Sequence, residues 1–208
     1  MSYLSLPTSL AAAPERQSMM ITLGIVGDTH VPDRIRSVPT AAFEILRAAN
    51  VVAILHTGDL SHPRVLDAFA AIAPVHAVRG NRDIWHRAGR ALPLQRILEF
   101  EGVGIGLTHG HGGLAGYVRE KIVYYTMGFS NDRVIRNVAA WFPAGDGTDV
   151  VVFGHTHRPM LRIVGERLFL NPGSLGPDYY TGRGPSLALL RLDDGEANAE
   201  IVPVPAGV

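Results

Sequence analysis

The sequence predicts an α/β fold in which two packed β-sheets are flanked by helices. Two strand-to-helix units open the chain, which favours parallel strands. About ten apolar runs have strand character against only four helical patterns, too many strands for a simple doubly wound sheet. Polar residues follow one strand after another where it ends, as expected of functional loops at one edge.

The composition describes a compact protein without a strong overall charge. Of 208 residues, 47% are hydrophobic and 18% charged, and the 19 basic and 19 acidic residues cancel. This balance argues against extended nucleic-acid binding and against attraction to an anionic membrane. There are no cysteines, which excludes disulfides and thiolate metal sites and leaves any metal to His, Asp, Asn and water.

The chain shows neither a membrane segment nor a charged secretory signal. No uninterrupted apolar run approaches the length of a membrane span, and the first basic residue is Arg16. We therefore expect a cytoplasmic protein that makes no membrane contact. Residues 1–18 have no usable period and are predicted to form a flexible extension of a single domain over residues 19–208.

The first half of this domain repeats a strand, a polar loop and a helix. The apolar run 21–26 predicts a strand, and apolar residues at helical spacing predict a helix over 38–49. The unit recurs as a strand over 51–55 and a helix over 63–72, in which Pro63 suits a first helical turn.

Three further strands follow. Residues 75–78 form a short apolar run that ends in a polar loop. The runs 96–100 and 103–107 are separated by Glu101-Gly102, which predicts a hairpin.

The segment between residues 117 and 142 is predicted to be helical and is rich in aromatic residues. Val118, Ile122, Tyr125 and Phe129 share one helical stripe, and Ser130 is a plausible N-cap for a second helix. The simplest interpretation is that both helices pack on a sheet. The alternatives are a cap over the site or a surface for homo-oligomer formation through residues 117–142.

The remaining runs complete the two sheets. Residues 149–153 are predicted to form a strand that is apolar from Val150 to Phe153, and 160–164 and 167–170 form a hairpin around Gly165-Glu166. Residues 186–192 and 199–204 supply the two closing strands.

The strand ends carry the candidate chemistry. His155 and His157 follow a buried strand with one residue between them, a spacing that lets two imidazoles converge on a metal. Such a pair is weak evidence alone, but the other strand ends add carboxylate, amide and imidazole groups. The candidate metal ligands are Asp28, His30, Asp59, Asn81, His109, His155 and His157.

Seven such groups suffice for two divalent ions roughly 3.5 to 4 Å apart if one carboxylate is shared. A water between two such ions loses a proton near neutral pH, and the resulting bridging hydroxide can attack phosphorus in line. The ions also neutralise the charge that develops on a phosphate ester. The predicted reaction is therefore hydrolysis of a small phosphoester.

The order of these motifs resembles the calcineurin-like metallophosphoesterase superfamily. The matching motifs are Asp28-Thr29-His30, Gly58-Asp59, Gly80-Asn81, His109 and Gly154-His155-Thr156-His157. The short length, Asn171-Pro172-Gly173-Ser174 and Pro185-Ser186-Leu187-Ala188 resemble its small bacterial and archaeal phosphodiesterase branch. The resemblance covers residues 21 to 205. It implies a four-layer αββα sandwich, in which two mixed β-sheets pack face to face with helices outside.

The resemblance implies a binuclear centre. One ion would be held by Asp28, His30, Asp59 and His157, and the other by Asp59, Asn81, His109 and His155, with Asp59 as the bridge. Two manganese ions are the expected cofactors, with iron, zinc, nickel and cobalt as alternatives.

One departure from the family pattern bears on catalysis. Many members carry a histidine after Gly-Asn, where it acts as the general acid, whereas this chain has Arg82. Arginine keeps its proton and can only stabilise phosphate charge, so we expect a preference for diesters or activated aryl esters. Asn81, Arg82 and His111 are the candidate catalytic residues, and His111 serves either as a substitute acid or in a supporting role.

Several alternatives remain open. Within the same fold they are a phosphomonoesterase, a cyclic nucleotide phosphodiesterase, a nuclease and a non-catalytic metal-binding scaffold resembling the retromer subunit. His56 either orients the bridging ligand or is an ordinary strand histidine, and Asp83 either pairs with Arg82 or is a loop acid. Asp178-Tyr179-Tyr180 either lines a substrate groove or forms an ordinary loop. The remaining histidines, expected at the surface, are His62, His76 and His86.

Overall fold

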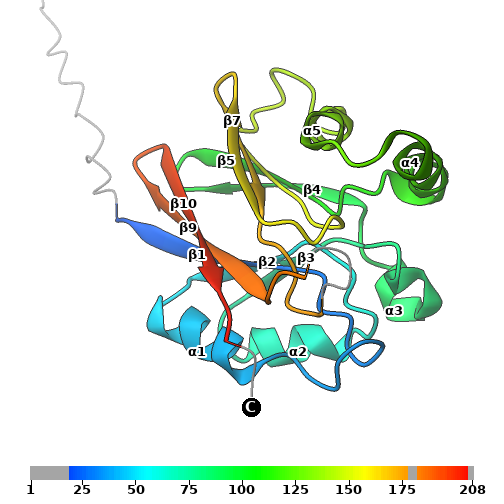
Figure 1. Cartoon of the computed structure of the whole chain (residues 1–208). Helices are drawn as coiled ribbons and strands as arrows, with labels where there is room; N and C mark the ends of the chain where they lie inside the picture. The colour runs from blue at the N-terminus through cyan, green and yellow to red at the C-terminus, as the bar shows by residue number, and fades with distance from the viewer. Residues whose placement is uncertain (1–18, 178–181, 206–208) are drawn as a thin grey trace, which may run out of the picture.

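The computed structural model describes residues 19–177 and 182–205, and its chain path is shown in Figure 1. The predicted extension 1–18 and the segment Asp178-Tyr179-Tyr180 lie outside the described residues. Within these ranges, ten strands form two five-stranded sheets with helices on their outer sides. The predicted four-layer sandwich of two mixed sheets is therefore confirmed.

The first sheet has the strand order β10-β9-β1-β2-β3. Its parallel part consists of β1 (Ile21–Val26), β2 (Ala53–His56) and β3 (Val75–Ala77). The hairpin of β9 (Ser186–Asp193) and β10 (Glu196–Pro203) joins antiparallel to β1. The carboxyl ends of the three parallel strands consequently lie at one edge of the sheet.

The second sheet has the order β4-β5-β6-β8-β7. Its centre is parallel and contains β5 (Val103–Thr108), β6 (Val150–Val152) and β8 (Arg167–Asn171). The edge strands β4 (Gln95–Phe100) and β7 (Met160–Val164) pair antiparallel with β5 and β8. Parallel central strands with buried faces explain why β6 is apolar at every position.

Strand β5 shows how the layers are spaced. Val103, Ile105 and Leu107 point into the apolar core between the two sheets. Two of the three alternate positions are glycines, Gly104 and Gly106, which bring the outer layer close: a Cβ on Gly106 would lie 2.7 Å from the ring of Phe142. The alternation therefore sets both the inner core and the distance to the outer layer.

Helices cover the outer faces of both sheets (Figure 1). On the first sheet, α1 (Thr40–Ala48) and α2 (Arg64–Ala70) bury Leu46 and Phe69 in an outer apolar cluster. On the second sheet, α5 (Asn131–Ala139) buries its apolar stripe, and the predicted N-cap Ser130 accepts a hydrogen bond from the N–H of Arg133.

Helix α4 (Gly113–Met127) differs from the prediction in start and in packing. It begins four residues earlier than expected, and its apolar stripe faces solvent: Val118, Ile122 and Tyr125 are 51%, 59% and 80% exposed. The interpretation that this stripe packs on a sheet is wrong. An apolar stripe shows that a helix has one apolar face but does not show what covers that face.

The expected total of four helices was also too low for the described part of the chain. Two short elements follow β3, the 3-10 helix η1 (Asp83–Trp85) and α3 (Arg87–Arg90). Each is about one turn long, too short for a hydrophobic period to appear in the sequence. Of the helices in the described ranges, none has both the length and the apolarity to cross a bilayer.

The core between the sheets should dominate stability. Leu190 of β9 is fully buried there, whereas Leu161 of β7 is 41% exposed. We expect Leu190→Ala to lower the free energy of unfolding by about 2–5 kcal/mol, because it leaves a cavity in a close-packed core. Leu161→Ala is the matched control and should change it by less than about 1 kcal/mol. Urea unfolding of both variants measures the difference, and equal losses would contradict this account of the core.

Candidate metal centre

The candidate ligands meet at one edge of the sandwich, where the parallel strands of both sheets end. Loops after β1, β2 and β3 come from the first sheet, and loops after β5 and β6 from the second. The buried members of the set, each no more than 6% exposed, include Asp28, His30, Asp59, His109 and His157. Residues separated by more than a hundred positions in sequence thus contribute to one polar cluster.

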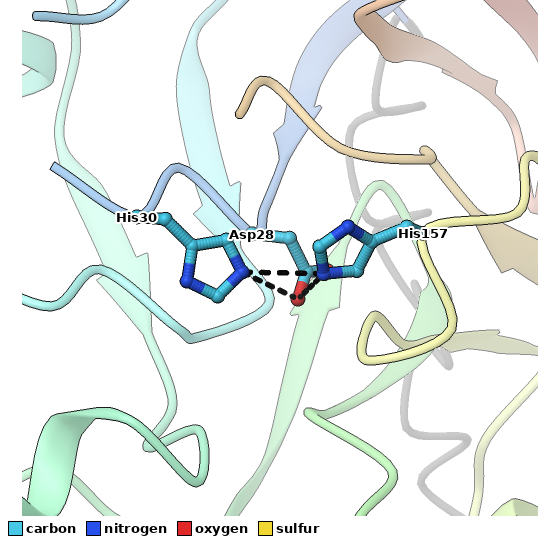
Figure 2. Close-up of side chains that lie close together, drawn as sticks. All are labelled: Asp28, His30 and His157. Carbon is cyan, nitrogen blue, oxygen red and sulfur yellow. Dashed lines mark hydrogen bonds and ion pairs between the residues drawn. The ribbon is translucent and has the colours of Figure 1, made fainter. Parts of the chain in front are cut away.

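One group of donor atoms forms around His157 (Figure 2). Its Nε2 lies 3.2 Å from Nε2 of His30 and 3.3 Å from Oδ1 of Asp28. His30 Nε2 lies 4.0 Å from the same oxygen. Three side chains from the ends of β1 and β6 therefore aim one nitrogen or oxygen each at a common point.

A second group forms around Nε2 of His109. Asn81 Oδ1 and His155 Nδ1 each lie 3.2 Å from this nitrogen, and Asp59 Oδ1 lies 3.5 Å away. His109 Nδ1 lies 2.8 Å from the carbonyl oxygen of Thr57. Since a carbonyl only accepts, Nδ1 carries the ring proton and Nε2 presents a lone pair to the group.

The carboxylate of Asp59 faces both groups. Its Oδ1 is directed to His109, and its Oδ2 lies 3.8 Å from Nε2 of His30. Asp28 is also near both groups, and its Oδ1 faces His157 and His30 of the first group. Asp59 differs in that each of its two oxygens faces a histidine of a different group.

The donor set fits divalent cations. Donors bound to one ion at about 2.1 Å lie about 3 Å apart, close to the separations found in both groups. Burial lowers the pKa of His30 to about 4, so its ring is neutral at neutral pH and can donate a lone pair. Burial alone would raise the pKa of Asp28, but His157, His109 and His30 bring it well below its usual range. These Asp and His residues could hold divalent metal ions.

The backbone at the ligands is unusual. Five of the seven candidates have positive φ: 49° at Asp28, 52° at His30, 54° at Asp59, 70° at His155 and 56° at His157. Residues with a Cβ rarely adopt this left-handed conformation, which costs about 1 kcal/mol or more each. The surrounding structure must therefore hold these loops in place.

Glycines before the ligands allow the loops to pack closely. A Cβ on Gly80 would lie 2.2 Å from Asp59 Oδ1, and one on Gly154 would lie 2.7 Å from Asp28 Oδ2. Such distances are shorter than atoms tolerate. Gly80 and Gly154 are thus required by the approach of the neighbouring carboxylates.

Asp83 fastens two of these loops together. Its carboxylate accepts the backbone N–H groups of Gly80, Asp59 and Ser61 at 2.7, 3.0 and 3.1 Å. The carboxylate of Asp83 therefore binds backbone N–H groups, in place of the ion pair with Arg82 that was one of the two expectations. Burial and the nearby charge of Asp59 raise the pKa of Asp83, although three N–H donors favour the ionised form.

The segment predicted as a turn, Asn171-Pro172-Gly173-Ser174, supports two ligand loops. Asn171 donates its side-chain N–H to the carbonyl of Gly154 at 2.9 Å. Ser174 donates its hydroxyl to the carbonyl of Asp28 at 2.8 Å. This segment therefore ties the loop of the His pair to the loop after β1.

The candidate catalytic residues occupy different environments. Arg82 has an exposed side chain at the rim of the cleft over the site, and its backbone N–H donates to Asp59 Oδ1 at 2.8 Å. His111 is buried beside His109 and His155. Burial, together with those two rings, lowers the pKa of His111 to about 2. A ring that is neutral at neutral pH favours the supporting role over that of an acid.

His56 is also buried, and its Nδ1 accepts the backbone N–H of Gly58 at 3.1 Å. Burial lowers its pKa to about 3, so the neutral ring acts as an acceptor. It stabilises the loop that precedes Asp59, in the position expected of a supporting residue.

One residue of the site was not anticipated from the sequence. Glu120 of α4 lies 2.6 Å from Nε2 of His155. Burial lowers the pKa of His155, but the hydrogen bond and charge of Glu120 outweigh it and raise that pKa overall. No local pattern marks Glu120, because the contact depends on how α4 lies over the end of β6.

Helix α4 forms one wall of a cleft over the centre. The lining includes basic and aromatic side chains beside the candidate ligands. The basic members are Arg34, Arg82, Lys121 and Arg158, and the aromatic members are Tyr117, Tyr124, Tyr125 and Phe129. The interpretation of this segment as a cap over the site agrees with this position of α4.

Comparisons with known proteins identify a family of similar sequences. A family model described as the calcineurin-like phosphoesterase superfamily domain matches residues 21–195. A probable metallophosphoesterase of Methanothermobacter thermautotrophicus is 34% identical over 186 residues, covering 89% of this chain and 94% of the relative.

Solved structures share the fold. A single mutant of Vps29 from Entamoeba histolytica has a TM-score of 0.64 at 25% identity, covering 89% of this chain and all (100%) of its own. An archaeal phosphodiesterase has a TM-score of 0.56 at 24% identity, covering 88% of this chain and 100% of its own. At that identity the second likeness concerns the fold alone.

The role of Asp83 can be tested by its removal. We expect Asp83→Ala to lower the free energy of unfolding by about 3 kcal/mol or more, because it leaves three buried N–H groups without acceptors. Asp83→Asn keeps one acceptor oxygen and should lower the free energy of unfolding by less. Thermal or urea unfolding in the presence of a chelator measures stability without bound metal. Asp33→Ala, at an exposed loop position, is the control. If Asp83→Ala loses no more unfolding free energy than Asp33→Ala, Asp83 does not hold the two loops together.

Proposed function

The chain belongs to the calcineurin-like phosphoesterase superfamily, and we propose that it is a binuclear metal-dependent phosphodiesterase acting on a small phosphoester. The observation that carries the proposal is the carboxylate of Asp59 between two groups of donor atoms, with one oxygen directed to each. A shared carboxylate is the feature that distinguishes a pair of neighbouring ions from a single ion.

The proposed ligands divide into two sets. Those of the first ion are Asp28, His30, Asp59 and His157, and those of the second are Asp59, Asn81, His109 and His155. When bound, two such ions lower the pKa of a water and neutralise negative charge on a phosphoryl group. Manganese is the proposed metal, and an all-nitrogen and oxygen set also suits iron, zinc, cobalt and nickel.

The protein side chains around the ions orient the substrate. Asn81 lies at the floor of the cleft beside His109, where its amide can donate to a phosphate oxygen while its carbonyl oxygen faces the second group. Arg82 is adjacent and can pair with a second phosphate oxygen. The aromatic wall provided by α4 would contact the organic part of the ester.

The choice of a diester over a monoester follows from the proton donor. Arg82 keeps its proton, and His111 is neutral, so neither side chain readily protonates a poor leaving group. Esters whose leaving group departs without protonation, such as aryl diesters, are therefore the proposed substrates. The zero net charge supports a small substrate over an extended nucleic acid.

A non-catalytic scaffold is the second candidate. The likeness to Vps29 is consistent with it. The completeness of both donor groups favours the enzyme, since a scaffold has no need for five strained ligand positions. The cytoplasmic location and a homo-oligomer through residues 117–142 stay predictions.

Metal dependence tests the proposal. Purified protein with Mn²⁺ should bind two ions per chain and hydrolyse a bis-aryl phosphodiester, and a chelator should abolish turnover until Mn²⁺ is restored. We expect Asp59→Asn to lower turnover by more than about 100-fold, because the shared ligand loses its charge. Asp67→Asn, at an exposed position of α2, is the control. Full metal loading without turnover on mono-, di- and cyclic phosphoesters would instead identify a scaffold.

Arg82→His tests the account of the proton donor. The side chain is exposed, and the contact of residue 82 with Asp59 uses the backbone, so the substitution should leave the centre intact. A histidine there can donate a proton, and we expect hydrolysis of monoesters with poor leaving groups to rise by about 100-fold. Arg82→Gln removes the charge without adding an acid and should show no such rise. Unchanged monoester hydrolysis in Arg82→His would refute the account.

A further inference from the structure

Each ring nitrogen of His155 has a different polar partner. Nδ1 lies 3.2 Å from Nε2 of His109, within the second group of donors, and Nε2 lies 2.6 Å from Oε2 of Glu120. A carboxylate only accepts, so the ring donates from Nε2, and a neutral ring then has its lone pair at Nδ1. The contact with Glu120 thus selects which nitrogen faces the donor group.

His109 provides an internal comparison. Its Nδ1–H donates to the carbonyl of Thr57 at 2.8 Å, which leaves Nε2 to face the same donor group. The two imidazoles of the second group are therefore held in the same manner, one by a backbone carbonyl and one by a side-chain carboxylate. An acceptor on the far nitrogen fixes the tautomer and orientation of a metal-binding imidazole.

We infer that Glu120 is a positioning residue of the second metal site, which orients His155 through its Nε2–H so that Nδ1 is available to the cation. The inference rests on the proposed binuclear centre and adds a residue from outside the family motifs. Glu120 acts through His155 and is not itself a ligand in this arrangement.

The surroundings of Glu120 support a role at the site over a role in folding. The Glu120 side chain is 30% exposed, and that of His155 is 12% exposed. None of the side chains described on α4 is buried, so this helix adds little to the core. The ring of Tyr117 lies edge-on to that of His155, with 6.0 Å between the ring centroids. Two residues of α4, Tyr117 and Glu120, therefore lie against the His155 ring.

Metal affinity tests the inference independently of turnover. Apoprotein is titrated with Mn²⁺ by calorimetry, and the absorption spectrum of the Co²⁺-loaded protein reports coordination at each site. We expect Glu120→Ala to bind the first ion as the wild type does and the second about 10- to 100-fold more weakly. Glu120→Gln keeps an acceptor oxygen and should recover most of this affinity, which a loss of general stability would not explain.

Arg119→Ala is the matched control, an exposed neighbour on the same helix, and should leave both affinities unchanged. If the wild type binds two ions and Glu120→Ala binds each of them with the wild-type affinity, the inference is overturned while the proposed function stands. If the wild type fails to bind two ions, the binuclear proposal fails and the inference with it.

Discussion

Seven polar side chains from two different sheets must form two neighbouring groups of donor atoms in a largely buried place, and the rest of the structure depends on this constraint. Parallel strands bring the loops to one edge, because their carboxyl ends lie side by side. Glycines at positions 80 and 154 let those loops approach, and Asp83 and Asn171 then fix them by hydrogen bonds to the backbone. The same strands, glycines and hydrogen bonds therefore determine both the fold at this edge and the geometry of the site.

Much of the fold could be predicted because its signals are local. The boundaries of β1 and β7 agree with the apolar runs, and the remaining strands differ from prediction by a few residues at their ends. Hairpin turns and buried parallel strands leave clear patterns in sequence. The short elements η1 and α3 leave none, since a single turn has no period.

The sequence predicted which residues gather at the candidate site but not the contacts that hold them there. Asp59 and His109 follow strands, so their convergence could be inferred from topology. The contact of Glu120 with His155 and the three N–H groups on Asp83 depend on tertiary approach, and a lone acid in a helix or loop carries no mark of such a partner. The exposure of α4 was missed for a related reason, because the sequence shows an apolar face without its neighbour.

The left-handed backbone at five ligands has a consequence for how this protein can change. Glycine would adopt the same φ without strain at each of these positions, so backbone strain alone would favour replacement of the ligand, although Asp28 and Asp59 also accept hydrogen bonds that a glycine could not. Asp and His there place candidate metal-binding atoms on strained backbone, so stability and the proposed chemistry oppose each other at the same residues. A variant that gave up the proposed chemistry could relieve this strain one residue at a time, while the sandwich around these residues stayed the same.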